Sequence, residues 1–305
     1  MLLIISAWYD YCINSLTENV MSQVLDELLN LLKLEPIEQG LYRGQSQDLG
    51  FRALFGGQVM GQALSAAQET VDPARYVHSL HSYFLRPGDA KKPVVYEVEV
   101  IRDGNSFSTR RVKAIQHGNV IFYLTASFQA QEEGFEHQHQ MPTVPQPEEI
   151  PSYKDFIREH QHFIPEEVRD KFLAEKPIEL RPVEQYNWIK PEKTDPICHM
   201  WIKANGAMPN NQHIHHSMLA YTSDFHFLPT ALFTHGVSYW HPNFQLATID
   251  HSMWFHRPFR MDDWLLYVIE NPTNMNGRGL VRGQIYARTG ELVASTMQEG
   301  VMRQR

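Results

Sequence analysis

A chain of 305 residues in which 43% of the side chains are hydrophobic can bury a large core, in one large domain or in two of about 150 residues. The formal net charge of −8 disfavours a dedicated nucleic-acid binder, which would carry a basic excess, but it leaves room for a phosphorylated small ligand. The two cysteines, Cys12 and Cys198, lie outside paired motifs and no apolar run approaches the roughly 20 residues that cross a bilayer, so we expect a protein of the reducing cytoplasm without disulfides, zinc knuckles or a membrane span.

Residues 1–20 differ in pattern from the rest of the chain. No basic residue precedes the apolar start, as a signal peptide requires, and Asp10 ends that apolar run. Met21 is followed by Ser-Gln and has the look of a natural start. We therefore expect residues 1–20 to be an N-terminal extension that is disordered or loosely docked. The last three residues, Arg303-Gln-Arg305, are not a peroxisomal address.

The segment 21–130 predicts two helices followed by three strands. Leucines with helical spacing from Leu25 mark an amphipathic helix that stops near Pro36, and a second helix with many small residues spans 55–70. Strand-like runs separated by Gly-Asn turns then follow, at 94–102, 107–115 and 120–128.

The segment 201–305 repeats this order, with a helix at 216–228. Strand-like runs follow at 246–255, 264–270, 279–287 and 292–302. The string that begins His81-Ser-Tyr-Phe matches the one that begins His251-Ser-Met-Trp. A helix followed by antiparallel strands, twice over, predicts an α+β fold that arose by duplication.

The segment 131–200 has a different composition. Nine of the 18 prolines fall between Pro142 and Pro196, which disfavours long helices and strands. We expect a Pro-rich connection with one helix at 153–162. Because it is too long for a simple loop, it should pack along the surface of both halves.

Two common kinds of catalytic site are not supported by motifs. The strings at Gly104 and Gly236 lack the second glycine of a Gly-x-Ser-x-Gly elbow, which disfavours a serine hydrolase of the α/β type. The Gly277-Arg-Gly279 string is too short to cradle phosphates and has no Walker lysine.

Asp224 is one of three polar candidates in apolar segments of the second half. It lies near the edge of the apolar stripe of the helix at 216–228. A carboxylate there is costly unless it is hydrogen-bonded or takes part in chemistry. A solvated aspartate at the helix edge is the ordinary alternative.

Thr248 and Gln298 are the other two. Strand alternation predicts Thr248 and Asp250 on one face and His251 on the other, while Gln298 shares a face with Thr296. A strand threonine is often structural, and a buried glutamine is often a satisfied core amide. Together with Asp224 they supply a carboxylate, a hydroxyl and an amide, the groups needed to orient one water toward a carbonyl.

Sixteen histidines raise the question of a metal site. The string His213-Ile-His-His216 has no carboxylate or cysteine partner at standard ligand spacing, so no metal is expected. A hydratase acting on enoyl-CoA would need an Asp and a His five residues apart. Asp250 and His256 are six apart and narrowly miss this pattern.

Several long strings resemble acyl-CoA thioesterase II, the TesB type, from about residue 22 to 303, most closely a bacterial member. The strings are Phe55-Gly-Gly-Gln, Leu85-Arg-Pro-Gly-Asp89, Arg102-Asp-Gly-Asn-Ser-Phe107, Ser223-Asp224, Thr248-Ile-Asp-His-Ser-Met-Trp-Phe-His-Arg-Pro-Phe259 and Ser295-Thr-Met-Gln-Glu-Gly300. The resemblance implies a double hot-dog fold, in which each half wraps a curved antiparallel sheet around a long helix. It also implies hydrolysis of medium- to long-chain fatty acyl-CoA without a cofactor, and a homo-oligomer.

The resemblance turns the three polar candidates into a catalytic set of Asp224, Thr248 and Gln298. The first half offers Ala126 at the position of Gln298, which suggests that it shapes the pocket instead of carrying a second set. A backbone N–H near Gly56-Gly57 is our candidate for stabilising the oxyanion. Candidate ligands for the phosphates of CoA are Arg257, Arg278 and Arg282. Two alternatives remain open: a non-catalytic acyl-CoA binding or sensing protein, and an enoyl-CoA hydratase on the same fold.

Overall fold

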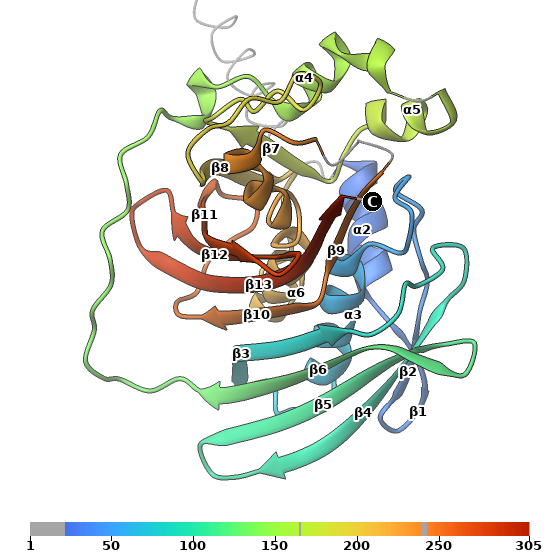
Figure 1. Cartoon of the computed structure of the whole chain (residues 1–305). Helices are drawn as coiled ribbons and strands as arrows, with labels where there is room; N and C mark the ends of the chain where they lie inside the picture. The colour runs from blue at the N-terminus through green and yellow to red at the C-terminus, as the bar shows by residue number, and fades with distance from the viewer. Residues whose placement is uncertain (1–21, 165, 239–242, 305) are drawn as a thin grey trace, which may run out of the picture.

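The first half of the chain forms a curved sheet around one central helix (Figure 1). The computed structural model describes residues 22–164, 166–238 and 243–304, so the expected extension 1–20 lies outside the described residues. The elements of this half are α2 (Gln23–Leu32), β1 (Glu35–Glu38), β2 (Leu41–Gly44), α3 (Gly56–Gln68), β3 (Arg75–Phe84), β4 (Val94–Asp103), β5 (Phe107–Gln116) and β6 (Asn119–Ala130).

The second half repeats this arrangement after a connection with short helices. The connection contains η1 (Pro147–Glu149), α4 (Tyr153–Glu159), η2 (Gln161–Phe163) and α5 (Glu166–Leu173). The second half consists of β7 (Ile178–Pro182), β8 (Ile197–Ala204), α6 (Gln212–Thr222), η3 (Leu228–His235), β9 (Phe244–Thr248), β10 (Asp250–Phe255), β11 (Leu265–Met275), β12 (Arg278–Ala287) and β13 (Leu292–Gln304).

The two halves share one antiparallel sheet. Its order is β1-β2-β4-β5-β6-β3-β10-β13-β12-β11-β8-β7, with β9 paired to β13 off this path. The order is symmetric about the pair β3–β10, because each strand of the first half has its counterpart at the same distance on the other side, for example β6 and β13. The seam is the antiparallel pair β3–β10, where Leu80 lies opposite Met253. The structure therefore confirms the expected α+β fold with a hot-dog unit in each half.

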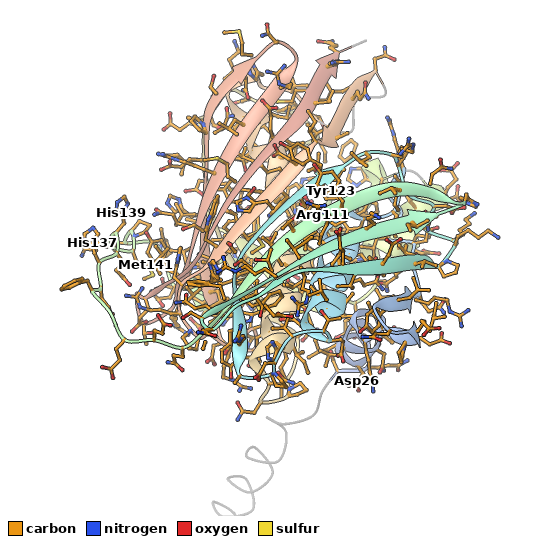
Figure 2. The ribbon with its side chains drawn as sticks, turned by 90° about the horizontal axis from the view of Figure 1, so that it is seen from below. Asp26, Arg111, Tyr123, His137, His139 and Met141 are labelled. Carbon is orange, nitrogen blue, oxygen red and sulfur yellow. The ribbon has the colours of Figure 1, made fainter. Side chains whose placement is uncertain are left out.

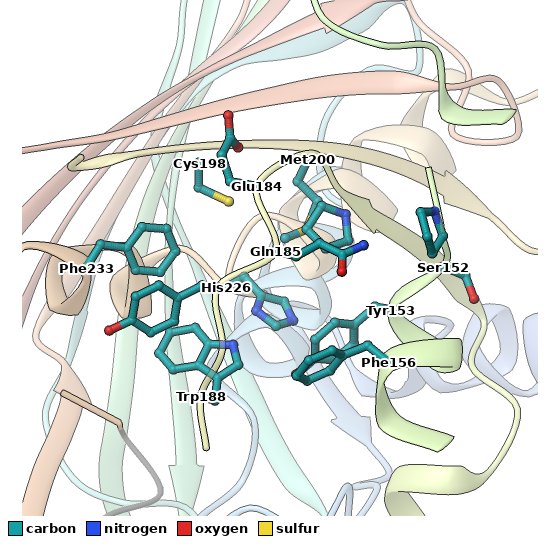
Figure 3. Close-up of a pocket in the computed structure, with 13 residues that line it drawn as sticks. Ser152, Tyr153, Phe156, Glu184, Gln185, Trp188, Cys198, Met200, His226 and Phe233 are labelled. Atoms are coloured by element: carbon teal, nitrogen blue, oxygen red, sulfur yellow. The ribbon is translucent and has the colours of Figure 1, made fainter. Parts of the chain in front are cut away.

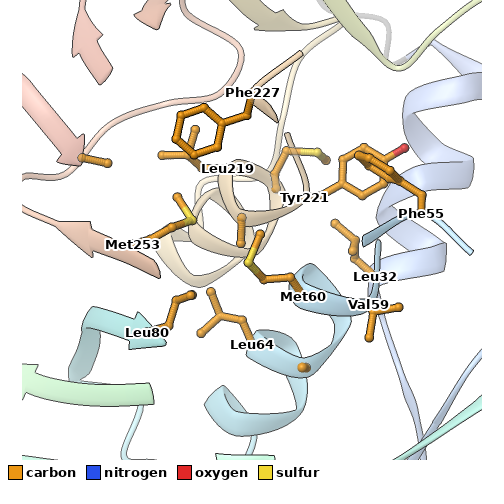
Figure 4. Close-up of a cluster of buried hydrophobic side chains, with 14 of the residues drawn as sticks. Leu32, Phe55, Val59, Met60, Leu64, Leu80, Leu219, Tyr221, Phe227 and Met253 are labelled. Carbon is orange, nitrogen blue, oxygen red and sulfur yellow. The ribbon is translucent and has the colours of Figure 1, made fainter. Parts of the chain in front are cut away.

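The central helices α3 and α6 pack against each other in antiparallel directions inside this sheet (Figures 1 and 4). A Cβ atom on Gly61 would lie 3.0 Å from the backbone oxygen of Ser217, so the helices approach closely where side chains are small. The Ser65 and Ser217 hydroxyls are 3.0 Å apart. Met60 and Leu219 fill the adjoining core (Figure 4). The N-terminus of α3 consequently lies beside the C-terminus of α6.

The connection contacts both halves, as its length predicted. The Trp201 indole donates a hydrogen bond to the backbone oxygen of Pro145, 2.9 Å away, and the Arg288 guanidinium pairs with Glu148. On the other side, Lys171 of α5 pairs with Asp48 of the first half at 2.7 Å. Before these contacts in the chain, the stretch from His137 to Met141 runs along the outside of the molecule (Figure 2).

The strand β7 lies inside the segment 131–200 that the sequence interpretation assigned to the connection, and β8 begins inside it. These strands were not predicted from the sequence, because the flanking prolines, among them Pro177 and Pro196, disfavour strand structure. They correspond to β1 and β2 at the opposite end of the sheet, and the outermost strand β7 tolerates Pro182 because it is an edge strand. No helix in the described part of the chain is long and apolar enough to span a membrane.

Candidate active site

Asp224 lies just beyond the C-terminus of α6 and faces the N-terminus of α3. The prediction that it sits on a helix running to residue 228 is wrong, because α6 ends at Thr222 with Ser223 as its cap. His226 has a φ of +56°, a left-handed conformation that a helix cannot contain. The Gly57 N–H donates a hydrogen bond to Asp224 Oδ2 at 2.9 Å. A carboxylate is favoured there because the first N–H groups of a helix lack intrahelical acceptors.

The two glycines at the start of α3 make this approach possible. A Cβ atom on Gly56 would lie 2.7 Å from Asp224 Oδ2, and one on Gly57 would lie 2.2 Å from the backbone oxygen of Tyr221. Side chains at either position would therefore push the two helix ends apart. The predicted site residues Gly56 and Gly57 do lie at the candidate site, and the Gly57 N–H is used by Asp224.

Gln298 lies in the last strand and joins the other two candidates. It is completely buried, and its amide nitrogen donates to Thr248 Oγ1 at 2.6 Å. The Gln298 side chain also acts on the Asp224 carboxylate, whose pKa it lowers. The structure therefore brings together the carboxylate, hydroxyl and amide that the sequence singled out, from three separate elements.

A shift in strand register places the Thr248 side chain on the same face of the sheet as Gln298. Thr248 is opposite Gly300, but Ser252 is opposite Met297, so the register slips by one residue between β9 and β10. The Asp250 carboxylate accepts the Glu299 N–H at 2.8 Å within this bulge. Simple alternation, which put Thr248 and His251 on opposite faces, is wrong for this reason.

His251 is a residue of the site that the sequence analysis missed. It is completely buried, and its Nδ1 lies 2.8 Å from Gln298 Oε1. Its Nε2 lies 3.1 Å from the Ser223 hydroxyl. Burial lowers the pKa of His251 to about 4, so the ring is neutral at pH 7. The bulge would have had to be recognised from the sequence in order to place His251 on the same face as Thr248.

The electrostatic environment of Asp224 suits a base that works near neutral pH. Burial raises the pKa of Asp224 from 3.8 to about 7, although hydrogen bonds from the Gly57 N–H and the Gln298 side chain act in the opposite direction. The neighbouring Tyr267 hydroxyl lies 2.9 Å from Thr296 Oγ1, and burial raises the pKa of Tyr267 so that it stays protonated. The carboxylate thus has no cationic partner among these neighbours.

The three arginines predicted to bind CoA phosphates do not join this cluster. Arg278 pairs with Glu299 and Arg282 with Glu270, at 2.9 and 2.6 Å. In the ladder β12–β13 both arginines alternate with the position of Gln298 and so occupy the outer face of the sheet. Arg257 pairs with Glu136 of the connection at 3.1 Å.

The comparison with known proteins decides the family. Profiles described as acyl-CoA thioesterase and acyl-CoA thioesterase N-terminal domain match residues 167–301 and 45–129. "Acyl-CoA thioesterase 2" of Haemophilus influenzae is 46% identical over 93% of this chain and 99% of its own length. The chain belongs to the acyl-CoA thioesterase II family.

Other relatives of this thioesterase agree in sequence and in fold. Human "acyl-coenzyme A thioesterase 8" is 42% identical, and the match covers 90% of this chain and 88% of that protein. The crystal structure of the acyl-CoA thioesterase II TesB2 from Mycobacterium marinum superposes with a TM-score of 0.75 at 39% identity, covering 91% of this chain and 98% of that one.

In the first half of the thioesterase, different side chains occupy the position that corresponds by the duplication to the site of Asp224 and Gln298. Thr70 follows the cap of α3 as Asp224 follows the cap of α6. Arg110, only 2% exposed, donates from Nε to Thr70 Oγ1 at 2.9 Å and pairs with Asp103. Ala126, the counterpart of Gln298, lies opposite Arg110 in the ladder β5–β6. The duplicated position is therefore closed by a buried arginine and has neither the carboxylate nor the amide.

An apolar pocket lies between the connection and the second half, next to the segment that follows Asp224 (Figure 3). His226 reaches it two residues after Asp224, and its ring lies 4.6 Å from that of Tyr153 in α4. The further lining is largely aromatic or apolar and includes Phe156, Tyr186, Trp188, Cys198, Met200 and Phe233. Burial raises the pKa of the Cys198 thiol, which keeps that sulfur protonated and unreactive.

Proposed function

We propose that this protein hydrolyses medium- to long-chain fatty acyl-CoA to the free fatty acid and CoA, with the attacking water held by Asp224, Thr248 and Gln298. The convergence of these three side chains carries the proposal, together with membership of the thioesterase family. We infer a cytoplasmic enzyme that works as a homo-oligomer without a cofactor. Among the described residues no group of histidine, cysteine and acidic side chains is arranged to hold a metal ion.

In the proposed reaction water displaces the thiolate in a single attack. Asp224 accepts the proton of the water, while Thr248 and Gln298 fix the water against the thioester carbonyl. The tetrahedral intermediate then expels CoA as the thiolate, a good leaving group because a thiol has a pKa of roughly 8.5.

The oxyanion of that intermediate needs N–H donors. Because the Gly57 N–H is already engaged by Asp224, we assign this role to the first-turn N–H groups of Gly56 and Gln58 in α3. A donor of this kind is worth about 10²–10³-fold in turnover in other hydrolases.

The test is release of free thiol from decanoyl-CoA and palmitoyl-CoA by the purified protein. Steady thiol release at a rate proportional to enzyme supports hydrolysis. Tight binding without release would indicate an acyl-CoA binding or sensing protein. Loss of the ultraviolet band of an enoyl thioester without thiol release would indicate a hydratase.

The raised pKa of Asp224 predicts how the reaction depends on pH. The base must be ionised, so activity is full above the folded-state pKa and falls as pH drops through it. We expect kcat/KM to decline as the pH falls through the Asp224 pKa of about 7, which should be the midpoint of the loss. The pH profile of thiol release at low substrate checks this, with circular dichroism to show that the fold persists. A flat profile down to pH 5 would exclude Asp224 as the base.

We further propose that the apolar pocket beside His226 receives the methyl end of the acyl chain. Its aromatic lining suits an alkyl tail, and its position beside the Asp224 segment would leave the thioester near the water site. In this view the helix α4 of the connection limits chain length, because Phe156 closes one side of the pocket (Figure 3).

The change Phe156→Ala tests this assignment. Removal of the ring frees space for more methylenes, so the ratio of kcat/KM for palmitoyl-CoA to that for decanoyl-CoA should rise by about tenfold. The control is Phe135→Ala, which removes a fully exposed ring in the connection. The measurement is thiol release over a series of chain lengths. An unchanged ratio would place the acyl chain elsewhere.

A further inference from the structure

We propose that His251 is a positioning residue that selects the productive orientation of the Gln298 amide. The proposal rests on the proposed function, in which Gln298 holds the attacking water. It assigns to a buried histidine outside the catalytic set a defined task in that reaction.

The Gln298 amide has two ends with different requirements. Its nitrogen donates to the Thr248 hydroxyl at 2.6 Å, and the side chain lowers the pKa of the Asp224 carboxylate, as a donor turned toward that carboxylate would. An ionised carboxylate can only accept hydrogen bonds, so the amide is productive only with its NH₂ group turned toward Asp224. Rotation of the amide by half a turn would place Oε1 against the carboxylate and repel it.

His251 supplies the group that distinguishes the two orientations. Its Nδ1 lies 2.8 Å from Gln298 Oε1, so a proton on Nδ1 is donated to that oxygen. While the proton stays on Nδ1, the rotated amide would set its NH₂ group against this N–H and leave a buried donor without an acceptor, which is unfavourable. The histidine therefore penalises the wrong orientation from the side opposite Asp224.

The surroundings of His251 hold the ring in place. Its Nε2 lies 3.1 Å from the hydroxyl of Ser223, the cap of α6 and the neighbour of Asp224, and in this tautomer Nε2 accepts the Ser223 proton in place of the Ala220 backbone oxygen, which is 3.0 Å from the same hydroxyl. The Phe227 ring packs on the imidazole with centroids 5.5 Å apart. Ser82 of β3 donates to the backbone oxygen of His251 at 2.8 Å and pins its strand at the seam. The histidine thus links the amide of one catalytic residue with the chain segment that carries the other.

The test combines three changes in a double-mutant cycle. His251→Phe should lower kcat by about tenfold to a hundredfold with little change in KM, since one buried hydrogen bond that orders the amide is lost. In a Gln298→Ala background the same change should lower kcat no further, because the amide on which it acts is gone. His251→Asn, which can keep a donor near Nδ1, should retain most of the parental kcat.

A second readout separates positioning from a structural role. The hydrogen bond from Gln298 lowers the pKa of Asp224, so a disordered or rotated amide should raise it further. The acid limb of kcat/KM in His251→Phe should move upward by about one pH unit. The ionisable neighbours, Tyr267 and His251 itself, are uncharged at pH 7 and do not mask this shift.

The control is His81→Phe, at the same seam but on the outer face of the sheet, opposite Ser252. It should leave kcat and the pH profile unchanged. The proposal is overturned if His251→Phe lowers kcat by the same factor in the parent and in the Gln298→Ala background. It is also overturned if a folded His251→Asn has a kcat as low as that of Gln298→Ala. Should His251→Phe fail to fold, His251→Asn and its pH profile decide alone. Failure of the proposed function would instead appear as full activity in Gln298→Ala.

Discussion

Asp224→Asn should lower kcat by about 10²–10⁴-fold, the usual contribution of a positioned acid–base group, while the folded state becomes more stable. The amide cannot take a proton from water, yet its oxygen can still accept the Gly57 N–H that Asp224 Oδ2 accepts at 2.9 Å. Turnover is lost because the base is lost, and the local geometry is kept.

The gain in stability follows from the direction of the pKa shift. The pKa of Asp224 is raised to about 7 in the folded state, so folding disfavours the charged form. At pH 8 the parent protein keeps this partly buried charge at a cost in the free energy of unfolding, and the neutral amide removes that cost. Below pH 7 the parent becomes protonated and the difference in stability should shrink.

Two measurements on one sample check this prediction: thiol release from decanoyl-CoA and urea unfolding at pH 8 and pH 6. Asp72→Asn is a matched control, because Asp72 is an exposed carboxylate shortly after the end of the pseudo-equivalent helix α3. It should change neither quantity. A variant at Asp224 that kept its turnover, or that lost activity only because it unfolded, would remove this residue from the mechanism.

The repeat in the sequence was enough to predict the α+β duplication, since helix and strand periodicities recur in both halves. Asp224, Thr248 and Gln298 were weak candidates from their patterns alone, and the family resemblance joined them into a set. Alternation along one strand could not reveal the bulge at Asp250, because a bulge is a property of pairing between strands. His251 was missed for the same reason.

The contact between the helix ends was also beyond the reach of the sequence. Gly57 and Asp224 are 167 residues apart and meet only because the seam β3–β10 brings α3 and α6 together. The glycines at 56 and 57 could be read as reducing helix propensity or as possible oxyanion donors. The structure shows that they are needed so that the start of one helix can touch the end of the other.

Gly57→Ala should therefore reduce both stability and activity, unlike the change at Asp224. Helix propensity alone favours alanine over glycine by about 1 kcal/mol. Against this, the new Cβ would lie 2.2 Å from the backbone oxygen of Tyr221 and 2.6 Å from the Phe55 ring. A backbone oxygen cannot rotate away as a flexible side chain can, so α3 must shift against α6.

Such overpacking costs about 1–3 kcal/mol, and a clash this close to backbone belongs at the upper end, so the net change should be a loss of about 2 kcal/mol in the free energy of unfolding. The shift also carries the Gly57 N–H away from Asp224, and kcat should fall by at least tenfold because catalysis is sensitive to displacements of about 1 Å. Gly134→Ala is the control, since a Cβ there meets no atom within 4 Å. Urea unfolding and thiol release measure the two effects. A Gly57→Ala protein that was more stable and kept its turnover would show that the two helix ends do not need to touch, and that Asp224 does not depend on the Gly57 N–H.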